Sequence, residues 1–170
     1  MILKKGDMFK EFGSVDCTLF LVTTNAYVKD NGELVMGRGA ALQLKDRVPE
    51  SPAELGKRIP SECSFKMYDH SSIPYGVVMV DTEESYRRNH QAYGAFQVKR
   101  HFKERADLYL IRHSARMLAW WLRDDPDWQN DWVVMNVPGI GAGHLDRAAV
   151  LPILEEEFDG LRNLGIYEYE

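Results

Sequence analysis

The sequence predicts an α/β layered sandwich with a mostly parallel sheet, and three observations support this fold class. Short apolar segments rich in β-branched residues alternate along the chain with longer segments of helical periodicity. Two glycine-rich loops each follow a strand-like segment and lead into a helical pattern. The 170 residues are 45% hydrophobic and show no repeat or linker, so we expect one domain over residues 1–170.

The expected strands are short apolar segments bounded by turn residues. They cover residues 2–5, 15–24, 65–68, 76–81, 132–137 and 165–169. The segment 15–24 is rich in β-branched residues, and we expect both it and the segment 132–137 to be buried strands.

The expected helices combine helical apolar spacing with recognisable ends. They cover residues 39–48, 51–59, 106–123 and 147–164. Pro49 stops the first helix, and Ser51 followed by Pro52 favours the start of the second. The third helix carries one apolar stripe, which is typical of an amphipathic helix.

Composition argues against several classes of function. The net charge of −5 argues against a protein whose whole surface binds nucleic acid, although it allows a local basic groove. The two cysteines, Cys17 and Cys63, are too few for a disulfide framework, so we expect reduced thiols. The chain has no CxxC, HExxH or clustered ligand spacing, so we expect no metal. We see no secretory or membrane-spanning segment and expect a cytoplasmic protein without membrane contact.

The first glycine-rich loop, residues 34–41, contains Gly37 and Gly39. It is not a P-loop, because no Gly-Lys-Ser/Thr follows, and it lacks the third glycine of the dinucleotide motif. The pattern fits either a tight turn before a helix or a loop whose backbone N–H groups approach a ligand.

The second glycine-rich loop, residues 137–147, has glycines at alternate positions: Gly139, Gly141 and Gly143. A simple turn needs one or two residues with positive φ, so a third glycine favours a binding loop over a plain connection. Two such loops on one sheet would form a cradle for a diphosphate, which points to a nucleotide-type ligand.

Several polar residues near these loops are candidates for chemistry. Asn25 ends a strand, where its amide could hold a ribose hydroxyl or a water, or form an Asx-type turn instead. Lys99 follows an apolar approach, so partial burial or neighbouring Arg100 could lower its pKa and make the amine nucleophilic. Asp146 fits either a general acid/base or a helix N-cap, and His144 is equally ambiguous.

The stretch from Arg87 to Arg105 is the basic part of an acidic protein. Four aromatic residues, Tyr86, Tyr93, Phe96 and Phe102, interleave with its cations. This mixture suits phosphate contacts combined with base stacking, so we expect DNA contact here, with a solvated loop as the alternative.

With these features the sequence resembles the macrodomain family, whose members are α/β/α modules that bind ADP-ribose. The resemblance is carried by Gly6-Asp7-Met8, by Thr24-Asn25 with Val35–Leu42, and by Val137–Gly143. It implies a three-layer α/β/α sandwich with a mixed, mostly parallel central sheet. It also implies that ADP-ribose is bound by Asp7, Met8, Asn25, Met36, Gly37, Arg38, Gly39, Ala40, Pro138, Gly139, Ile140, Gly141, Ala142, Gly143 and His144.

Two further segments are similar to macrodomains that remove ADP-ribose. Phe96–Phe102 is similar to the lysine-bearing segment of antitoxin macrodomains, which reverse ADP-ribosylation of DNA bases. Leu145-Asp146-Arg147 is similar to the Leu-Asp-Arg of the terminal ADP-ribose protein glycohydrolase. The resemblance implies that Lys99 attacks or polarises the anomeric carbon and that Asp146 handles protons and water. The chain departs from the family pattern by an insertion at Val28–Glu33 and by His144 before the Leu-Asp-Arg.

We therefore expect an ADP-ribosyl glycohydrolase that removes ADP-ribose from a modified macromolecule, either a DNA base or an acidic protein side chain. A non-catalytic ADP-ribose reader remains an alternative, because it needs the glycine loops but neither Lys99 nor Asp146. A hydrolase of a free ADP-ribose derivative is a second alternative. We expect no cofactor, and we expect a monomer because the sequence shows no long unexplained apolar face.

Overall fold

The computed structural model describes residues 1–59, 75–89, 91–124, 126, 128 and 130–169. Within these ranges six strands form one sheet in the order β1-β6-β5-β2-β4-β3. The strands are β1 (Ile2–Lys5), β2 (Leu19–Asn25), β3 (Val77–Val80), β4 (Ala92–Lys99), β5 (Val133–Asn136) and β6 (Leu164–Glu168). All neighbouring pairs are parallel except β3 with β4, so the sheet is mixed and mostly parallel, as predicted.

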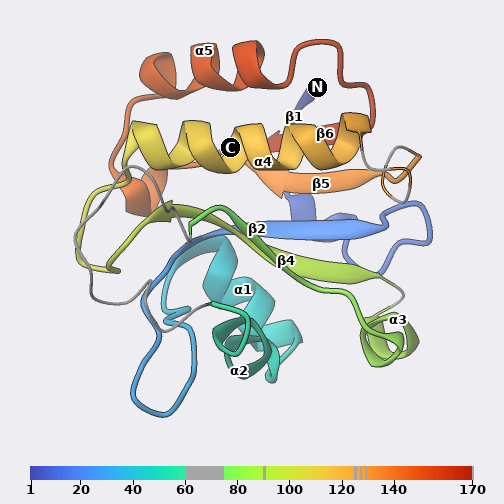
Figure 1. The fold of residues 1–170 in the computed structure, drawn as a ribbon, viewed down its shortest axis with the longest axis vertical. Coiled ribbons are helices and arrows are strands. Elements are labelled where there is room, and N and C mark those ends of the chain that lie inside the picture. Colours follow the sequence, from blue (N-terminus) through green and yellow to red (C-terminus); the bar gives the residue numbers. More distant parts are fainter. Residues whose placement is uncertain (60–74, 90, 125, 127, 129, 170) are drawn as a thin grey trace.

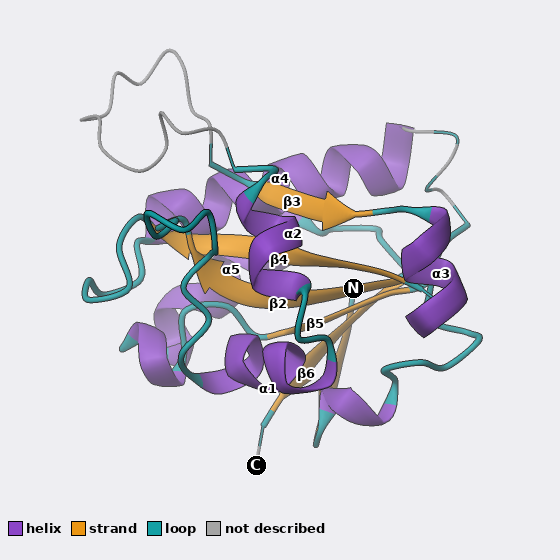
Figure 2. Cartoon of the chain, turned by 90° about the horizontal axis from the view of Figure 1, so that it is seen from below, coloured by secondary structure: helices purple, strands orange, loops and turns teal. Residues whose placement is uncertain are grey.

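Helices cover both faces of this sheet. Helices α4 (Leu108–Asp124) and α5 (Arg147–Glu157) lie on one face, and α1 (Gly39–Arg47) and α2 (Ser51–Gly56) lie on the other (Figure 1). Helix α3 (Glu83–Asn89) lies beside the amino end of β4 (Figure 2). Two 3₁₀ turns, η1 (Met8–Lys10) and η3 (Gly141–Gly143), follow strands β1 and β5. The predicted three-layer sandwich is confirmed.

The alternation of side chains along β2 shows why both faces need helices. Leu19 and Leu21 belong to the apolar cluster beneath α4 and α5, whereas Phe20 and Val22 belong to the cluster beneath α1 and α2. Successive strand residues point to opposite faces, so an uninterrupted apolar strand is stable only when both faces are covered.

The structure differs from the sequence prediction in three elements. Strand β4 and helix α3 lie in the stretch that we interpreted as a basic, aromatic connection. The helix expected over 147–164 ends at Glu157, and Gly160 adopts φ +74° in the turn that follows, so the chain reaches β6 earlier than predicted. The strand expected over 65–68 lies outside the described residues.

The single described cysteine, Cys17, is buried and free. Burial raises the pKa of its thiol to about 11, so the thiol stays protonated near neutral pH, as expected of a structural cysteine. In the described part of the chain, no helix combines the length and the apolar character needed to cross a membrane. No group of three or more metal-ligating side chains occurs among the same residues.

Five of the strands, β1, β6, β5, β2 and β4, run in one direction. Their carboxyl ends therefore meet at one edge of the sheet, which is where open α/β sheets place their ligand crevices.

Candidate functional site

A cavity of about 1160 Å³ lies at this carboxyl edge. Its lining includes residues at or directly after the ends of all five parallel strands, together with the two glycine-rich loops. Such a volume slightly exceeds the usual range of about 300–1,000 Å³ for small-molecule sites. The cavity is thus large enough for a nucleotide-sized ligand.

Most residues that sequence analysis assigned to the site do line this cavity. They are Asp7, Met8, Asn25, Gly37, Arg38, Gly39, Ala40, Lys99, Gly139, Ile140, Gly141, Ala142, Gly143 and His144. Three others lie outside the lining: Met36, Pro138 and Asp146. Met36 and Pro138 are buried, whereas the exposed Asp146 precedes helix α5 without making a side-chain cap hydrogen bond.

The side chain of Asn25 is engaged by the backbone. Its Oδ1 accepts a hydrogen bond from Tyr27 N at 2.8 Å, which is the predicted Asx-type turn. Its Nδ2 donates to Val35 O at 2.8 Å. Asn25 therefore anchors the chain that leads into the first glycine loop, where α1 begins with Gly39 in the cavity wall.

The glycines of the second loop serve different purposes. Gly139 has φ +77°, and a Cβ there would approach the methyl groups of Ile111 and Leu145 to 2.7 and 2.8 Å, so the fold itself requires glycine. Gly141 has φ +70°, but no other atom would lie within 4 Å of an added Cβ.

Gly37 in the first loop has neither constraint. Its φ lies outside the left-handed region, and an added Cβ would meet nothing within 4 Å. Packing within the protein therefore gives no reason for a glycine at this point of the cavity wall.

Lys99 ends β4 and its amine joins two loops. Its Nζ donates to Ala142 O at 3.1 Å and to Glu104 O at 3.0 Å. Partial burial, followed by the positive charge of Arg38, lowers the pKa of this amine from its ordinary value, while Glu104 opposes the shift. The expected partial burial is confirmed, and the cation that contributes is Arg38 from the first loop rather than the adjacent Arg100.

Comparison with solved structures gives the fold its name. The Mycobacterium tuberculosis DarG macrodomain superposes with a TM-score of 0.68 over 99% of this chain and 95% of its own, at 23% identity. The Thermus aquaticus DarG macrodomain superposes with a TM-score of 0.67 over 99% of this chain and 97% of its own, at 17% identity. The chain has the macrodomain fold.

A third structure, Thermosipho africanus DarTG, was solved in complex with ADP-ribose. This macrodomain fold matches it with a TM-score of 0.67 and 22% identity, over 100% of the chain and 42% of DarTG. No family model and no curated protein sequence matches the chain.

The macrodomain cavity also has walls that sequence analysis missed. Phe102, Lys103 and Glu104 line it after β4, Asn136 lines it after β5, and Tyr167 lines it from β6. Asn136 could have been found, because it is a polar residue at the end of an apolar strand. The others come together only through the parallel arrangement of strand ends.

A ring cluster formed by Tyr27, His101 and Phe102 meets this wall at Phe102, which is exposed, whereas the other two rings are partly buried. The His101 and Phe102 rings are stacked with centroids 4.3 Å apart, and Tyr27 meets both edgewise at 4.6 and 5.4 Å. Phe102 remains 39% exposed although His101 stacks on it. Phe102 thus offers an aromatic surface to the cavity that Lys99 also lines.

The insertion that follows Tyr27 forms a tight turn, segment 28–34, which packs on α2. Its two ends bridge to each other, and Leu34 N donates to Pro52 O at 2.8 Å. Its tip carries Gly32, whose carbonyl lies where a side chain on Gly56 would project. Segment 28–34 is therefore a fixed part of the fold and holds Tyr27 in place.

The basic stretch from Arg87 to Arg105 is not one continuous surface, and two of the aromatic residues expected to stack on bases are buried, while the DNA contact itself stays a prediction. Tyr93 and Phe96 lie in β4 and are 2% and 0% exposed, so they cannot stack on bases. Arg87 and Arg88 lie on α3, at the end of β4 away from the cavity.

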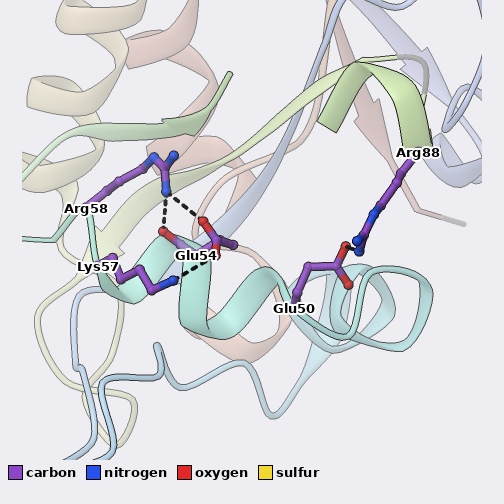
Figure 3. A network of polar contacts seen from close by, with 5 residues as sticks. All are labelled: Glu50, Glu54, Lys57, Arg58 and Arg88. Atoms are coloured by element: carbon purple, nitrogen blue, oxygen red, sulfur yellow. Dashed lines mark hydrogen bonds and ion pairs between the residues drawn. The ribbon is translucent and has the colours of Figure 1, made fainter. Parts of the chain in front are cut away.

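Arg88 is also engaged in ion pairs. Its guanidinium pairs with Glu50 at 3.1 Å and with Glu84. Figure 3 shows Arg88 extending to Glu50 just before α2, where Glu54 makes its own pairs with Lys57 and Arg58. Of the cations in the basic stretch, Lys99 and Lys103 line the cavity.

Proposed function

We propose that this chain binds ADP-ribose in the cavity and hydrolyses it from a modified macromolecule, either a DNA base or an acidic protein side chain. The observation that carries the proposal is the position of Lys99. Its amine has a lowered pKa and lies in the wall of a nucleotide-sized cavity, fastened to the second glycine loop. A structure of the same fold, Thermosipho africanus DarTG, contains ADP-ribose, which supports the choice of ligand.

The two glycine loops supply the proposed diphosphate site. Gly37 leaves open space in the cavity wall, and helix α1 begins two residues later, so its N-terminal N–H groups and dipole favour an anion. The second loop faces the same cavity with Gly141 and Ala142. A diphosphate held between these loops would place the attached distal ribose toward Lys99.

The proposed reaction cleaves the bond between C1″ of the distal ribose and the acceptor. The lone pair of the neutral Lys99 amine forms a C–N bond at C1″ while the acceptor departs with the electrons of the broken bond and takes up the proton that the alkylated nitrogen releases. Water then bonds to C1″ through its oxygen and returns a proton to the nitrogen as the C–N bond breaks, which releases ADP-ribose and restores the neutral amine. A lowered amine pKa raises the neutral, nucleophilic fraction, and positioning by the loops supplies a large share of the rate enhancement.

The ring cluster favours a nucleobase as the acceptor. Phe102 and Lys103 line the cavity that contains Lys99, so the group attached to C1″ would lie against them. A planar base gains from stacking on an exposed ring, whereas a carboxylate side chain does not. Arg100 and Arg105 flank the cluster in sequence and add positive charge for a nucleic-acid backbone.

The test compares wild type with Lys99→Ala on ADP-ribosylated DNA and on ADP-ribosylated acidic protein, with calorimetric binding of free ADP-ribose. We expect turnover by wild type only, with the affinity of the variant reduced by no more than about fivefold, because it loses two partly exposed hydrogen bonds. Undiminished turnover by Lys99→Ala would refute the mechanism. Absence of ADP-ribose binding by wild type would refute the ligand assignment.

A matched variant tests the acceptor. Phe102→Ala is expected to slow release from DNA about tenfold or more, because base stacking contributes about 1–3 kcal/mol, and to leave release from acidic protein unchanged. Equal loss on both substrates would remove the argument for a nucleobase.

A non-catalytic reader is the second candidate, and one observation favours it. The two carbonyl contacts of Lys99 already give this residue a structural role, because they fasten the second loop to the end of β4. Tight ADP-ribose binding by wild type without release from either substrate would assign the chain to the reader class.

A further inference from the structure

One polar side chain in the cavity wall lacks a hydrogen-bond partner within the protein. Thr24 is 4% exposed and lines the cavity, and its Oγ1 makes no hydrogen bond to any described residue. Two other buried side-chain atoms of the described chain share this state, on Gln97 and His113, and neither residue lines the cavity. An unpartnered buried hydroxyl costs stability, so its presence in a binding cavity calls for an explanation.

The neighbouring threonine shows what a satisfied hydroxyl looks like here. Thr23 Oγ1 accepts a hydrogen bond from Asn136 Nδ2 at 2.8 Å. Consecutive strand residues point to opposite faces, so Thr24 points to the side of α1, as Phe20 and Val22 do. On that side no described residue supplies a partner for its hydroxyl.

The sheet order locates Thr24 relative to the proposed ligand. Strand β2 lies between β5, which leads into the second glycine loop, and β4, which ends at Lys99. The distal ribose must connect a diphosphate at the loop with the reacting carbon at the amine. It would therefore pass over the end of β2, where Thr24 stands.

We propose that Thr24 determines specificity for the distal ribose, by a hydrogen bond between its Oγ1 and a hydroxyl of that sugar. This inference rests on the proposed function, because it takes ADP-ribose as the ligand. No described residue supplies a partner for the hydroxyl, and a hydroxyl of the sugar would supply one. A ligand without the distal ribose would leave it unpartnered.

The experiment is calorimetric titration of ADP-ribose and of ADP, which lacks the distal ribose, into wild type, Thr24→Val and Thr24→Ser. We expect Thr24→Val to bind ADP-ribose about tenfold more weakly and ADP as wild type does, since the loss of one hydrogen bond in a buried site has this magnitude. Thr24→Ser keeps the hydroxyl and should retain most of the affinity for ADP-ribose.

Thermal unfolding provides the control for folding. Thr24→Val should be at least as stable as wild type, because it removes an unsatisfied group, whereas Thr23→Val should lose stability because Asn136 loses a partner. If wild type binds ADP-ribose and Thr24→Val binds it equally well, or loses both ligands equally, the inference fails while the proposed function stands. If wild type binds neither ligand, both the proposed function and this inference fail.

Discussion

The amine of Lys99 lies 3.1 Å from the carbonyl oxygen of Ala142, so the end of β4 is fastened to the second glycine loop. As long as the amine is an ammonium, it can donate to this carbonyl and to that of Glu104 together. The neutral amine keeps two N–H groups, enough for both carbonyls, and gains a free lone pair. Loss of one proton therefore removes the charge from both hydrogen bonds, which weakens them, and supplies the lone pair that the proposed reaction needs.

The first prediction concerns the pH dependence of release. The Arg38 charge lowers the pKa of the Lys99 amine, so removing it raises that pKa and lowers the neutral fraction at a given pH. Arg38→Gln should shift the rising limb of the pH profile of kcat to higher pH. Steady-state turnover at saturating substrate between pH 6 and 10 measures the shift, and an unmoved limb would contradict the role of Arg38.

A second prediction distinguishes two carboxylates. Glu104 lines the cavity and interacts electrostatically with Lys99, whereas Asp146 lies outside the lining. The Glu104 charge raises the pKa of Lys99, so Glu104→Gln should lower this pKa further and shift the rising limb of the pH profile of kcat to lower pH. Asp146→Asn should leave the limb unmoved and kcat within a few-fold of wild type. A large loss of kcat in Asp146→Asn in single-turnover assays would support the role in handling protons and water that the resemblance implies.

A third prediction separates binding from folding in the glycine loops. Gly37→Ala adds a methyl group to open space in the cavity, so it should leave the melting temperature unchanged and weaken ADP-ribose binding. Gly139→Ala adds a strained φ and a collision with two side chains, so it should lower stability by about 1–3 kcal/mol. Calorimetry and thermal unfolding on both variants give the comparison. Unimpaired binding by Gly37→Ala would argue against a ligand beside that loop.

A fourth prediction concerns acid stability. Glu157 is 8% exposed and pairs with Arg112 and Arg116 at 2.8 Å each, which ties α5 to α4. Its hydrogen bonds to these arginines outweigh burial and hold the pKa of the carboxyl below its ordinary value. Glu157→Gln should cost about 1–2 kcal/mol at pH 7, because the arginines are partly exposed.

The pH window of this effect follows from the sign of the shift. A carboxyl whose pKa is lower in the folded state stabilises it above the unfolded-state pKa and loses this contribution as pH falls through the folded-state pKa. Urea unfolding should therefore separate wild type from Glu157→Gln at pH 7, and the difference should vanish under strongly acidic conditions. A difference that persists there would assign the effect to packing.

The sequence predicted the layers and both glycine loops because period and turn chemistry are local properties. The sequence did not predict β4, because a strand buried on both faces shows no alternation of apolar and polar residues. Its aromatic residues Tyr93 and Phe96 stand near cations in the sequence, a pattern that is also typical of base-stacking residues. The helix predicted over residues 147–164 extends past the end of α5, because Phe158 and Leu161 continue its apolar pattern beyond that end. Phe102 and Tyr167 could not be assigned to the cavity, since only the order of strands brings these distant segments together.

Gly56 lies in α2, beneath the tip of segment 28–34 and outside the cavity lining. Any side chain there would displace that tip, and with it the stretch of chain that positions Tyr27 in the ring cluster. Under the proposed function, the choice of acceptor would thus depend partly on a residue outside the cavity lining. A substitution at such a position could change the substrate of a protein with this fold, and a comparison of ligand-contacting residues alone between related proteins would not detect it.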